Sequence, residues 1–458
     1  MFQDDPIQFE PQDQSGTLRL SEILGAFTYA LDLTEGQAPG HSIRACWIGT
    51  QLAMAKGIKG PALRDIYYAV LLKDLGCSSQ AASVDDMFAG KGQEPEQGFQ
   101  MIGSVPKDIG EFIAGEAGGD VKPEVRSDPL GPLARNGENI IKNIMDTRSM
   151  RGAKIARQLR FSDDVAQAIG HLDEHWDGRG LPRGAAGTDI PLGARIALLA
   201  QVVDIFHSVR GKEAALQVVQ NRSGSWFDPD LCVLFEKLSS STGFWEELVL
   251  DDLPEQLWSL EPAAQYVPVD EDYLDDISVA FGQVIDAKSP YTAGHSQRVG
   301  KIADKIAEKL GLEGDRRRML RRAATLHDIG KLAVSSAILD KPGKLDADEW
   351  KIMQSHAAYT TNILGRIGAM ADMAMIAGSH HERLDGKGYP LGLDERSIAM
   401  ESRIITVADI YDALTAERPY RTAMSREKAM DILQGEVGAA VDEKCFAALQ
   451  AVIDEGEI

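Results

Sequence analysis

Apolar residues in this chain recur mostly at the three- and four-residue spacing of a helix. In the stretch VGKIADKIAEKLG they stand at Val299, Ile302, Ile306 and Leu310, a spacing that predicts a helix with one buried face. The stretch ESRIITVADIYDALTA predicts a second, more apolar helix towards the end of the chain. Runs that alternate apolar and polar residues, which are typical of strands, are scarce. We therefore expect an all-α fold made of helical bundles.

The chain also contains an internal repeat. ILGAFTYALDLTEGQAPGHSIRA (23–45) aligns with ISVAFGQVIDAKSPYTAGHSQRV (277–299) at an offset of 254 residues, and Ala, Phe, Asp, Gly, His, Ser and Arg match in place. Further along, LDEHWDGRGLP (172–182) aligns with HHERLDGKGYP (380–390) at an offset of 208 residues. The offsets differ by 46 residues, which predicts an insertion of that length in the first copy.

The repeat predicts two related helical domains. We expect the first over residues 15–240, with the insertion at about 78–143, and the second over residues 268–458. Apolar residues in the linker, residues 241–267, predict a short helix that packs between the domains, with a free linker as the alternative. These apolar residues are Trp245, Leu248, Leu253, Leu257 and Trp258.

Composition and charge narrow the class of protein. Hydrophobic residues make up 44% and charged residues 26% of the chain, as in a soluble globular protein. The formal charge of -22 argues against charge-driven binding to a nucleic acid polymer or a membrane surface. The four cysteines show no CxxC spacing, so no disulfide framework is expected. No signal peptide pattern and no stretch approaching the roughly 18–20 apolar residues of a membrane span is evident, which indicates a cytoplasmic protein.

The second copy holds five of the nine histidines. Neutral imidazoles bind borderline metals and a carboxylate can bridge two of them, so these histidines with two aspartates supply enough ligands for two adjacent metals. His327 and Asp328 are adjacent, so one of them can bind a single metal while its neighbour bridges both. The seven candidate ligands are His295, His327, Asp328, His356, His380, His381 and Asp409.

Two motifs of this copy resemble a known family. HDIGK (327–331) and HHERLDGKGYP (380–390), with the flanking YTAGHSQRV, ILDKPGKL and RPYR, are similar to the hallmarks of the HD-GYP subgroup of the HD phosphohydrolase superfamily. The resemblance covers nearly all of residues 270–440. It implies two tandem HD-type helical bundles, the first of them degenerate, and a binuclear iron or manganese site in the second that hydrolyses cyclic di-GMP.

The resemblance also implies how the ligands divide between the metals. One metal would be held by His295, His327, Asp328 and Asp409, and the other by Asp328, His356, His380 and His381. Some members of the family hold a third metal through a glutamate four residues before the first histidine. Tyr291 stands at that position here, so we expect two divalent metals, Fe or Mn.

Two metals suit the hydrolysis of a cyclic dinucleotide, because they acidify a bridging water and neutralise the phosphate. The expected nucleophile is a hydroxide that bridges both metals, with Asp328 as the shared carboxylate. The product would be linear pGpG, with GMP as a further product. Lys331 is expected to bind the phosphate and to stabilise or protonate the leaving oxygen. Arg418 and Arg421, in RPYR, resemble the family's second phosphate clamp.

Three other residues are candidates for substrate binding. Asp412 is expected to hold a basic group or a substrate base, or else to support a metal ligand or cap a helix. Lys387 and Tyr389 lie in the loop DGKGYP, whose glycines permit it to fold over the site. In the family this loop is associated with substrate access and with contacts to diguanylate cyclase domains. A plain structural turn is the alternative.

The first copy has lost most of the candidate ligands. Residues at the lost positions are Lys73, Arg148, Leu172, Asp173 and Gln201, while His41 and Asp74 are kept. A lysine and an arginine at ligand positions repel cations, so we expect no two-metal site in this copy.

Three roles are open for the first copy. It can be a packing or dimerisation partner, which includes the case of a homodimer. It can be a sensory pocket in which Lys73 and Arg148 receive an anionic ligand. A rebuilt metal site is the third, around His171 and His175, which are four residues apart on an expected helix. The third role would draw on Asp173, Asp204 and His207 as well.

The sequence thus indicates a bacterial-type cyclic di-GMP phosphodiesterase, with a catalytic second copy that the first copy regulates or dimerises. Another cyclic dinucleotide such as 3′,3′-cGAMP is the alternative substrate, because none of the candidate residues reads guanine. A scaffold that binds a cyclic dinucleotide with little turnover is a second alternative. A di-iron HD oxygenase is the third, and the second histidine of the pair and the GYP loop argue against it.

Overall fold

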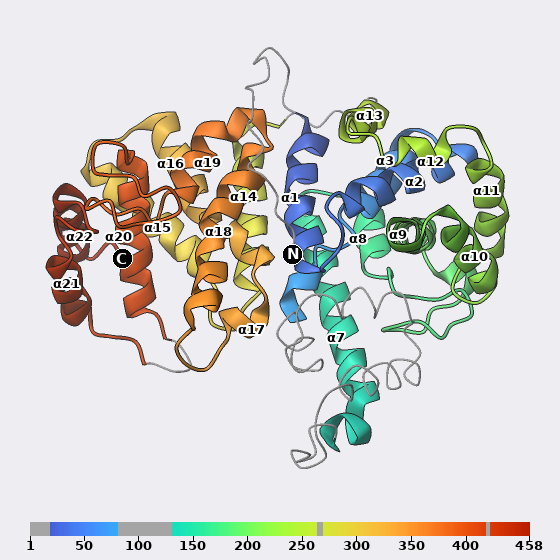
Figure 1. The fold of residues 1–458 in the computed structure, drawn as a ribbon, viewed down its shortest axis with the longest axis horizontal. Coiled ribbons are helices and arrows are strands. Elements are labelled where there is room, and N and C mark those ends of the chain that lie inside the picture. Colours follow the sequence, from blue (N-terminus) through green and yellow to red (C-terminus); the bar gives the residue numbers. More distant parts are fainter. Residues whose placement is uncertain (1–18, 81–130, 263–268, 418–421) are drawn as a thin grey trace.

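The structure is a computed structural model that describes residues 19–80, 131–262, 269–417 and 422–458. Within these ranges it consists of α-helices and short 3₁₀ helices, with three isolated bridges and no β-strand. The all-α class expected from the sequence is therefore confirmed. Two groups of helices lie side by side (Figure 1), and we call them the first half, residues 19–262, and the second half, residues 269–458.

The helices of the two halves follow one another in a similar order. The first half contains α1 (Leu20–Thr34), α2 (His41–Ala55), α3 (Gly60–Leu71), η1 (Cys77–Gln80), α7 (Gly131–Gln158), α8 (Asp163–Ile169), η3 (Gly187–Asp189), α9 (Leu192–Arg210), α10 (Lys212–Arg222), α11 (Pro229–Ser239), α12 (Phe244–Glu247) and α13 (Leu253–Leu260). The second half contains α14 (Glu271–Asp286), α15 (His295–Lys309), α16 (Gly314–Leu326), η5 (Ile329–Ala333), α17 (Ser336–Leu339), α18 (Ala347–Gly365), η6 (Gly368–Met370), α19 (Ala371–Gly378), α20 (Met400–Thr415), α21 (Arg426–Gly435) and α22 (Glu443–Asp454).

Helix boundaries repeat at the two offsets seen in the sequence. Helix α15 begins 254 residues after α2, and α20 begins 208 residues after α9. Glycines at equivalent positions, Gly40 and Gly294, precede α2 and α15 with positive φ angles of 81° and 72°. Glycine adopts this conformation at little cost, which explains why both helices start directly after it.

The halves pack against each other through equivalent elements. Helix α1 contacts η5 and α18 of the second half, while α14 contacts η1 and α7 of the first half. At the centre the equivalent residues Phe27 and Phe281 stack with ring centroids 4.2 Å apart. The hydroxyl of Thr34 donates to the carbonyl of Leu332 and that of Ser78 donates to the carbonyl of Val284. One continuous apolar core extends through both halves. The contact between equivalent elements resembles the isologous contact of a symmetric dimer.

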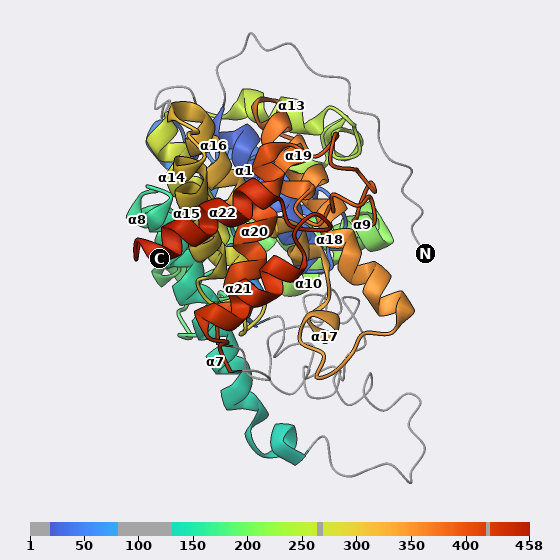
Figure 2. The same ribbon diagram turned by 90° about the vertical axis from the view of Figure 1, so that its left-hand side faces the viewer.

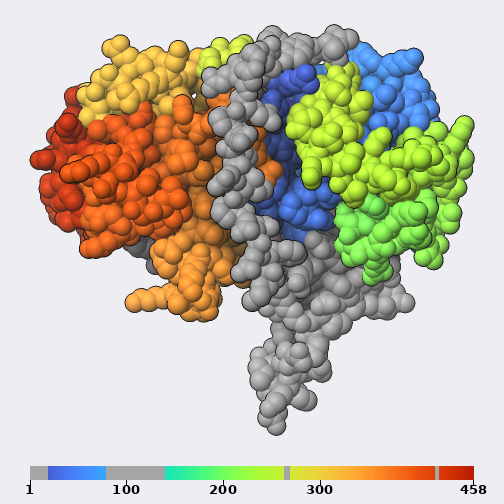
Figure 3. Space-filling view, turned by 45° about the horizontal axis from the view of Figure 1, so that its top comes forward, coloured from blue at the N-terminus to red at the C-terminus, as the bar shows by residue number. Residues whose placement is uncertain are grey.

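Outward from this contact, each half forms its own lobe. In the space-filling view the two lobes are distinct (Figure 3). Helices α20, α21 and α22 lie on the side of the second half that faces away from the first (Figure 2). In α15 the apolar stripe expected from the sequence is buried at Val299, Ile302 and Ile306, and it faces α16, α20 and α22.

The linker forms a helix, as its apolar residues predict, and this helix packs mainly on the first half. Helix α13 packs against α1 and α2, both in the first half. The indole of Trp258 lies directly on Gly25 of α1, where a Cβ atom would clash with the ring. Leu253 and Leu257 are buried, so the segment belongs to the core of the first half.

One helix in the described ranges is long and apolar enough to cross a membrane, whereas none was expected from the sequence. This helix is α9, with a mean hydropathy of 1.4, and 61% of the stretch is buried in the structure. It contacts α2, α3, α8 and α10. A core helix of a bundle meets the same length and hydropathy test, so α9 alone is weak evidence for a membrane span.

Candidate active site

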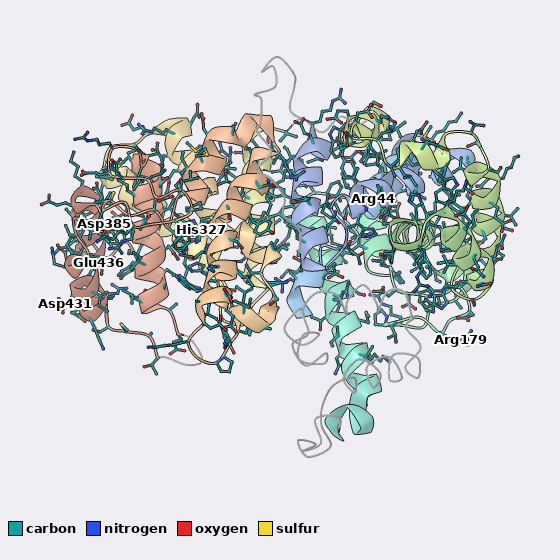
Figure 4. The ribbon with its side chains drawn as sticks, in the orientation of Figure 1. Arg44, Arg179, His327, Asp385, Asp431 and Glu436 are labelled. Atoms are coloured by element: carbon teal, nitrogen blue, oxygen red, sulfur yellow. The ribbon has the colours of Figure 1, made fainter. Side chains whose placement is uncertain are left out.

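The seven candidate ligands of the second half converge in its interior, although they come from five different parts of the fold. Three groups of side chains place all their ligand atoms within 4.8 Å of one another. These groups are His295, His327 and Asp409; His327, Asp328 and His380; and His356, His380 and His381. Figure 4 shows His327 well inside the second half. The first and third groups correspond to the two metal sites that the sequence predicts, and their binding of metal stays a prediction.

Asp328 lies between these two groups and turns one carboxylate oxygen towards each. Its Oδ2 is 3.5 Å from His295 Nε2 and 3.3 Å from His327 Nε2. Its Oδ1 is 3.5 Å from His356 Nε2 and 3.8 Å from His380 Nε2. A carboxylate in this position can bridge two metals, each held by one group of histidines.

The backbone fixes the orientation of three of these histidines in the same way. The Nδ1 atoms of His327, His356 and His380 lie 2.7, 2.6 and 2.7 Å from carbonyl oxygens three residues earlier. Because carbonyls only accept, each Nδ1 carries a proton, and in the neutral imidazole Nε2 is then the atom that offers a lone pair to the centre of the cluster. Second partners of this kind are typical of metal-binding histidines.

A carboxylate fixes the fourth histidine. Asp412 lies 2.8 Å from His295 Nδ1 through Oδ2, and Arg298 Nε donates to its Oδ1 at 2.6 Å. Asp412 is buried behind the His295 ring. Of the roles expected for Asp412, holding a basic group and supporting a metal ligand agree with this geometry. Contact of Asp412 with a substrate base stays a prediction.

Burial sets the protonation state of the histidines on one side of the cluster. It lowers the pKa of His356 to about 4 and that of His381 to about 3, so both are neutral at pH 7, the form that binds metal. Burial alone would also lower the pKa of His295. Hydrogen bonds with Asp328, Asp409 and Asp412 outweigh this effect and raise it. The cluster therefore combines neutral nitrogen donors with a concentration of carboxylate charge.

Two buried atoms of this cluster test whether a metal pair fits. His327 Nε2 and Asp328 Oδ1 are buried and make no hydrogen bond within the described residues. An unsatisfied buried polar atom costs about 1–3 kcal/mol, and both atoms belong to the face where the two groups meet. Nitrogen and carboxylate donors suit divalent transition metals, including iron and manganese. The residues present therefore fit two such metals.

Lys331 lies beside Asp328, with Nζ 2.5 Å from Oδ2 and a quarter of its side chain exposed. It does not lie on an α-helix with His327. Helix α16 ends at Leu326 and Lys331 belongs to the 3₁₀ helix η5. The turn tightens because Gly330 lies against the backbone of α18, where a Cβ atom would be 1.9 Å from the His356 carbonyl oxygen.

A residue that was not predicted from the sequence organises the loop after the histidine pair. Glu382 is buried, and its carboxylate accepts hydrogen bonds from the backbone N–H groups of Leu391, Gly392 and Leu393. In the first half, Glu174 accepts from Arg183 and Ala185 in the same manner. Its retention in both copies was the available signal that this glutamate holds the loop and not the ligands.

The remaining substrate candidates lie at different depths. The ring of Tyr389 packs against that of His381, with centroids 4.8 Å apart. Lys387 is on the outer side of the loop, 80% exposed and 3.8 Å from Asp385. Arg418 and Arg421 lie outside the described residues. Contacts of Tyr389, Lys387 and the two arginines with substrate stay predictions.

The first half repeats the frame of this site. Asp204 lies 2.8 Å from His41 Nδ1 and 2.7 Å from Arg44 Nε, which matches the contacts of Asp412 in the second half. Asp32 accepts hydrogen bonds from the backbone and hydroxyl of Ser42, and Asp286 accepts the same bonds from Ser296. The difference lies at the centre of the site, where other residues stand at five of the seven ligand positions.

Two internal cations fill that centre. Lys73 is buried and pairs with Asp74. Arg148 is 3.1 Å from Glu35 and also contacts Cys77. Both cations are already paired with buried groups of the same half. A sensory pocket at Lys73 and Arg148 stays a prediction, in which an anionic ligand would have to displace Asp74 and Glu35. Glu35, Asp74 and Cys77 cluster like metal ligands, but the two cations contact them directly.

A rebuilt metal site at His171 and His175 is not formed. Both follow the end of α8, His171 in a turn and His175 in the irregular segment after it, and neither lies on the helix that was expected. His175 stacks on Trp226 with centroids 4.0 Å apart, whereas His171 lies beside Arg183. None of the metal-like groups in the described ranges includes either residue. A cavity of about 1250 Å³ lies elsewhere, between the halves, and its lining includes Tyr29, Trp258 and Arg366.

The contacts of Asp204 with His41 and Arg44 predict an effect on the stability of the fold. Burial alone would raise the pKa of Asp204, but Arg44 and His41 outweigh it and lower the pKa from 3.8 to about 2. The ionised form therefore stabilises the fold above pH 4 by about 2 kcal/mol, and this is lost as pH falls towards 2. We expect Asp204→Asn to lower the stability measured by urea unfolding at pH 7 by about this amount. Asp163→Asn, at an exposed pair with Arg157, should change it by less than about 0.5 kcal/mol; equal effects would contradict the role of Asp204.

A comparison with protein families matches this chain to the HD domain, over residues 142–231 and 280–445. The second range contains all seven candidate ligands, and the first lies in the half that has lost most of them. Both ranges together cover more than half of the chain.

Curated relatives and one solved structure match most or part of the chain. The 3′3′-cGAMP-specific phosphodiesterase 3 of Vibrio cholerae serotype O1 is 46% identical over 96% of this chain and 95% of its own length. The cyclic di-GMP phosphodiesterase of Thermotoga maritima is 34% identical over 45% of this chain and 58% of its own length. The crystal structure of a cyclic GMP-AMP specific phosphodiesterase of V. cholerae, 43% identical, covers 96% of this chain and 98% of its own with a TM-score of 0.66.

Proposed function

Because this chain belongs to the HD domain family and carries the HD-GYP motifs, we propose that it is a metal-dependent phosphodiesterase that hydrolyses 3′,3′-cGAMP. The sequence alone favoured cyclic di-GMP, with 3′,3′-cGAMP as the alternative. The V. cholerae relative named for 3′3′-cGAMP shares 46% of its residues along nearly the whole chain, whereas the cyclic di-GMP relative from T. maritima matches less than half of it. The balance of similarity therefore supports the alternative.

The position of Asp328 is the observation on which the proposed phosphodiesterase activity rests. One of its oxygens faces His295 and His327 and the other faces His356 and His380. We assign one divalent metal to the group with Asp409 and the second to the group with His381. When bound, such a pair supplies a nucleophile from water at neutral pH and neutralises the charge of the phosphate.

The chain's own residues bind the substrate and assist the departure of the leaving oxygen. Hydrolysis forms a bond from a water oxygen to phosphorus and breaks the bond from phosphorus to the 3′-oxygen, which leaves with a proton. We assign to Lys331 the donation of that proton or the binding of a phosphate oxygen, and the position of its partly exposed Nζ beside Asp328 supports this role. Asp412 keeps His295 in one orientation throughout.

The first half acts in this proposal as a built-in partner of the second. Equivalent elements of the two halves contact each other as the subunits of a symmetric dimer do. The buried pairs of Lys73 and Arg148 keep the fold of the first half without metal. The role is therefore packing, as in the first of the three roles that the sequence left open, and a separate homodimer is not required for it.

Substrate preference is tested by competition. We expect purified protein, loaded with manganese or iron, to hydrolyse 3′,3′-cGAMP with a kcat/KM at least about tenfold above that for cyclic di-GMP. Both dinucleotides are mixed at equal concentration and the linear products are followed by chromatography. Faster loss of cyclic di-GMP would reverse the assignment and restore the substrate that the sequence first favoured.

The same preparation separates an enzyme from a scaffold. Binding of both dinucleotides without linear product, in protein that contains two metals per chain, would contradict hydrolysis and favour a receptor. A hydrolysis-inactive His327→Ala variant serves as the control for contaminating phosphodiesterase, since its preparation differs only in one candidate ligand.

A further inference from the structure

An exposed tryptophan stands at the edge of the candidate active site. Trp350 lies in the first turn of α18 and is 46% exposed, which is unusual for a side chain of this size. Its ring is 6.2 Å from that of Tyr389 and meets it at 80°. Tyr389 in turn packs on His381 at 4.8 Å and lies 6.3 Å from His356. The two aromatic rings therefore form a corner that runs from the metal-ligand cluster to the surface.

The first half supplies an internal comparison. At the offset of 208 residues, Trp350 corresponds to Lys142 and Tyr389 to Leu181. Lys142 occupies an exposed position in the equivalent helix α7, so the fold does not need an aromatic residue there. The aromatic corner is present in the copy that keeps seven candidate ligands and absent from the copy that has lost five of them.

We propose that Trp350 and Tyr389 form a stacking site for one purine base of the cyclic dinucleotide, with Trp350 as its outer wall. The inference rests on the proposed function and adds a substrate contact to it. In a nucleotide the base lies one sugar away from the phosphate. For a phosphate held beside His381 and His356, Tyr389 and Trp350 are the aromatic rings within reach of its base. A base stacked on the exposed indole presents its edge to the other ring, an arrangement that aromatic groups favour.

Stacking reads the face of a base and not its hydrogen-bonding edge, so this site accepts guanine and adenine alike. We expect Trp350→Ala to raise KM about tenfold for both 3′,3′-cGAMP and cyclic di-GMP, while kcat changes less than about twofold. Trp350→Phe should restore most of the loss. Ile352→Ala is the matched control, because Ile352 is an equally exposed apolar residue, at 47%, on the same helix, and it should leave KM unchanged.

Fluorescence gives a readout that is independent of turnover. Five of the six tryptophans lie in the first half and Trp350 is the sixth. A phosphorothioate analogue of 3′,3′-cGAMP should quench the emission of the metal-loaded wild type, and this quenching should be absent in Trp350→Phe. Unchanged KM in Trp350→Ala and equal quenching in Trp350→Phe, in protein whose wild type hydrolyses cyclic dinucleotides, would overturn the stacking site alone. Wild-type protein without any hydrolysis would instead remove the proposed function on which the site rests.

Discussion

Asp328→Asn is expected to lower kcat for cyclic dinucleotide hydrolysis by at least about 10³-fold. Asparagine keeps the shape of the side chain but loses the negative charge and one acceptor oxygen. Asp328 is the only one of the seven candidate ligands with an oxygen turned to each histidine group, so its loss removes a ligand from both metals. Metal content, measured by elemental analysis, should fall from about two per chain together with kcat.

The control for this variant is Asp348→Asn, at an exposed aspartate on α18 that pairs with Lys351 at the surface. It should keep the metal and the activity of the wild type. Chelation should inactivate the wild type reversibly, with activity restored by manganese or iron, whereas the same additions should not restore Asp328→Asn. Full turnover and two metals in Asp328→Asn, with an unchanged Tm, would show that Asp328 is not the shared ligand.

The candidate ligands could be found from the sequence because their types and order are specific. A histidine or aspartate at one position is common, but seven in the order of the HD-GYP motifs, with HDIGK and HHERLDGKGYP complete, leave few other interpretations. The repeat offsets were equally informative, since the starts of α2 and α15 reproduce one of them to the residue. Both signals depend only on which residue type stands at which position, and a single sequence contains this information.

The sequence could not show which way each side chain points or which partner it contacts. Asp412 and Asp409 are three residues apart on α20 and both looked suited to the site. Only the structure shows that Asp412 lies behind the His295 ring and Asp409 beside its Nε2. Lys73 and Arg148 likewise looked available to an anion, because residue type does not reveal that Asp74 and Glu35 already neutralise them. Pairing partners decide the role of a buried charge.

Backbone contacts are a third feature that residue types conceal. The glycine of HDIGK is explained by the approach of η5 to α18, since Gly330 N donates to the hydroxyl of Thr360, which itself donates to the His327 carbonyl. Gly76 occupies the same place in the first half, where a Cβ atom would be 2.0 Å from the Arg148 carbonyl oxygen. Both copies keep this glycine although only one keeps the ligands, so its role is packing.

This contact makes Gly330→Ala the most damaging small substitution that we expect outside the ligands themselves. The added Cβ would be 1.9 Å from His356 O and 2.7 Å from Thr360 N. Both atoms are helix backbone and cannot rotate away, so α18 must shift and carry His356 with it. We expect a loss of at least about 3 kcal/mol in stability to urea and a fall in bound metal.

Two glycines separate this clash from a general effect of alanine. A Cβ atom added at Gly435, the last residue of α21, would meet no other atom within 4 Å, so Gly435→Ala should leave stability and metal content unchanged. Gly76→Ala should destabilise the chain as Gly330→Ala does, because the clash with the helix backbone is equivalent, but folded protein should keep its metal, because Arg148 and not a ligand is displaced. Wild-type stability and two metals in Gly330→Ala would mean that η5 and α18 are not held in contact. The position of His356 against Asp328 would then need another cause.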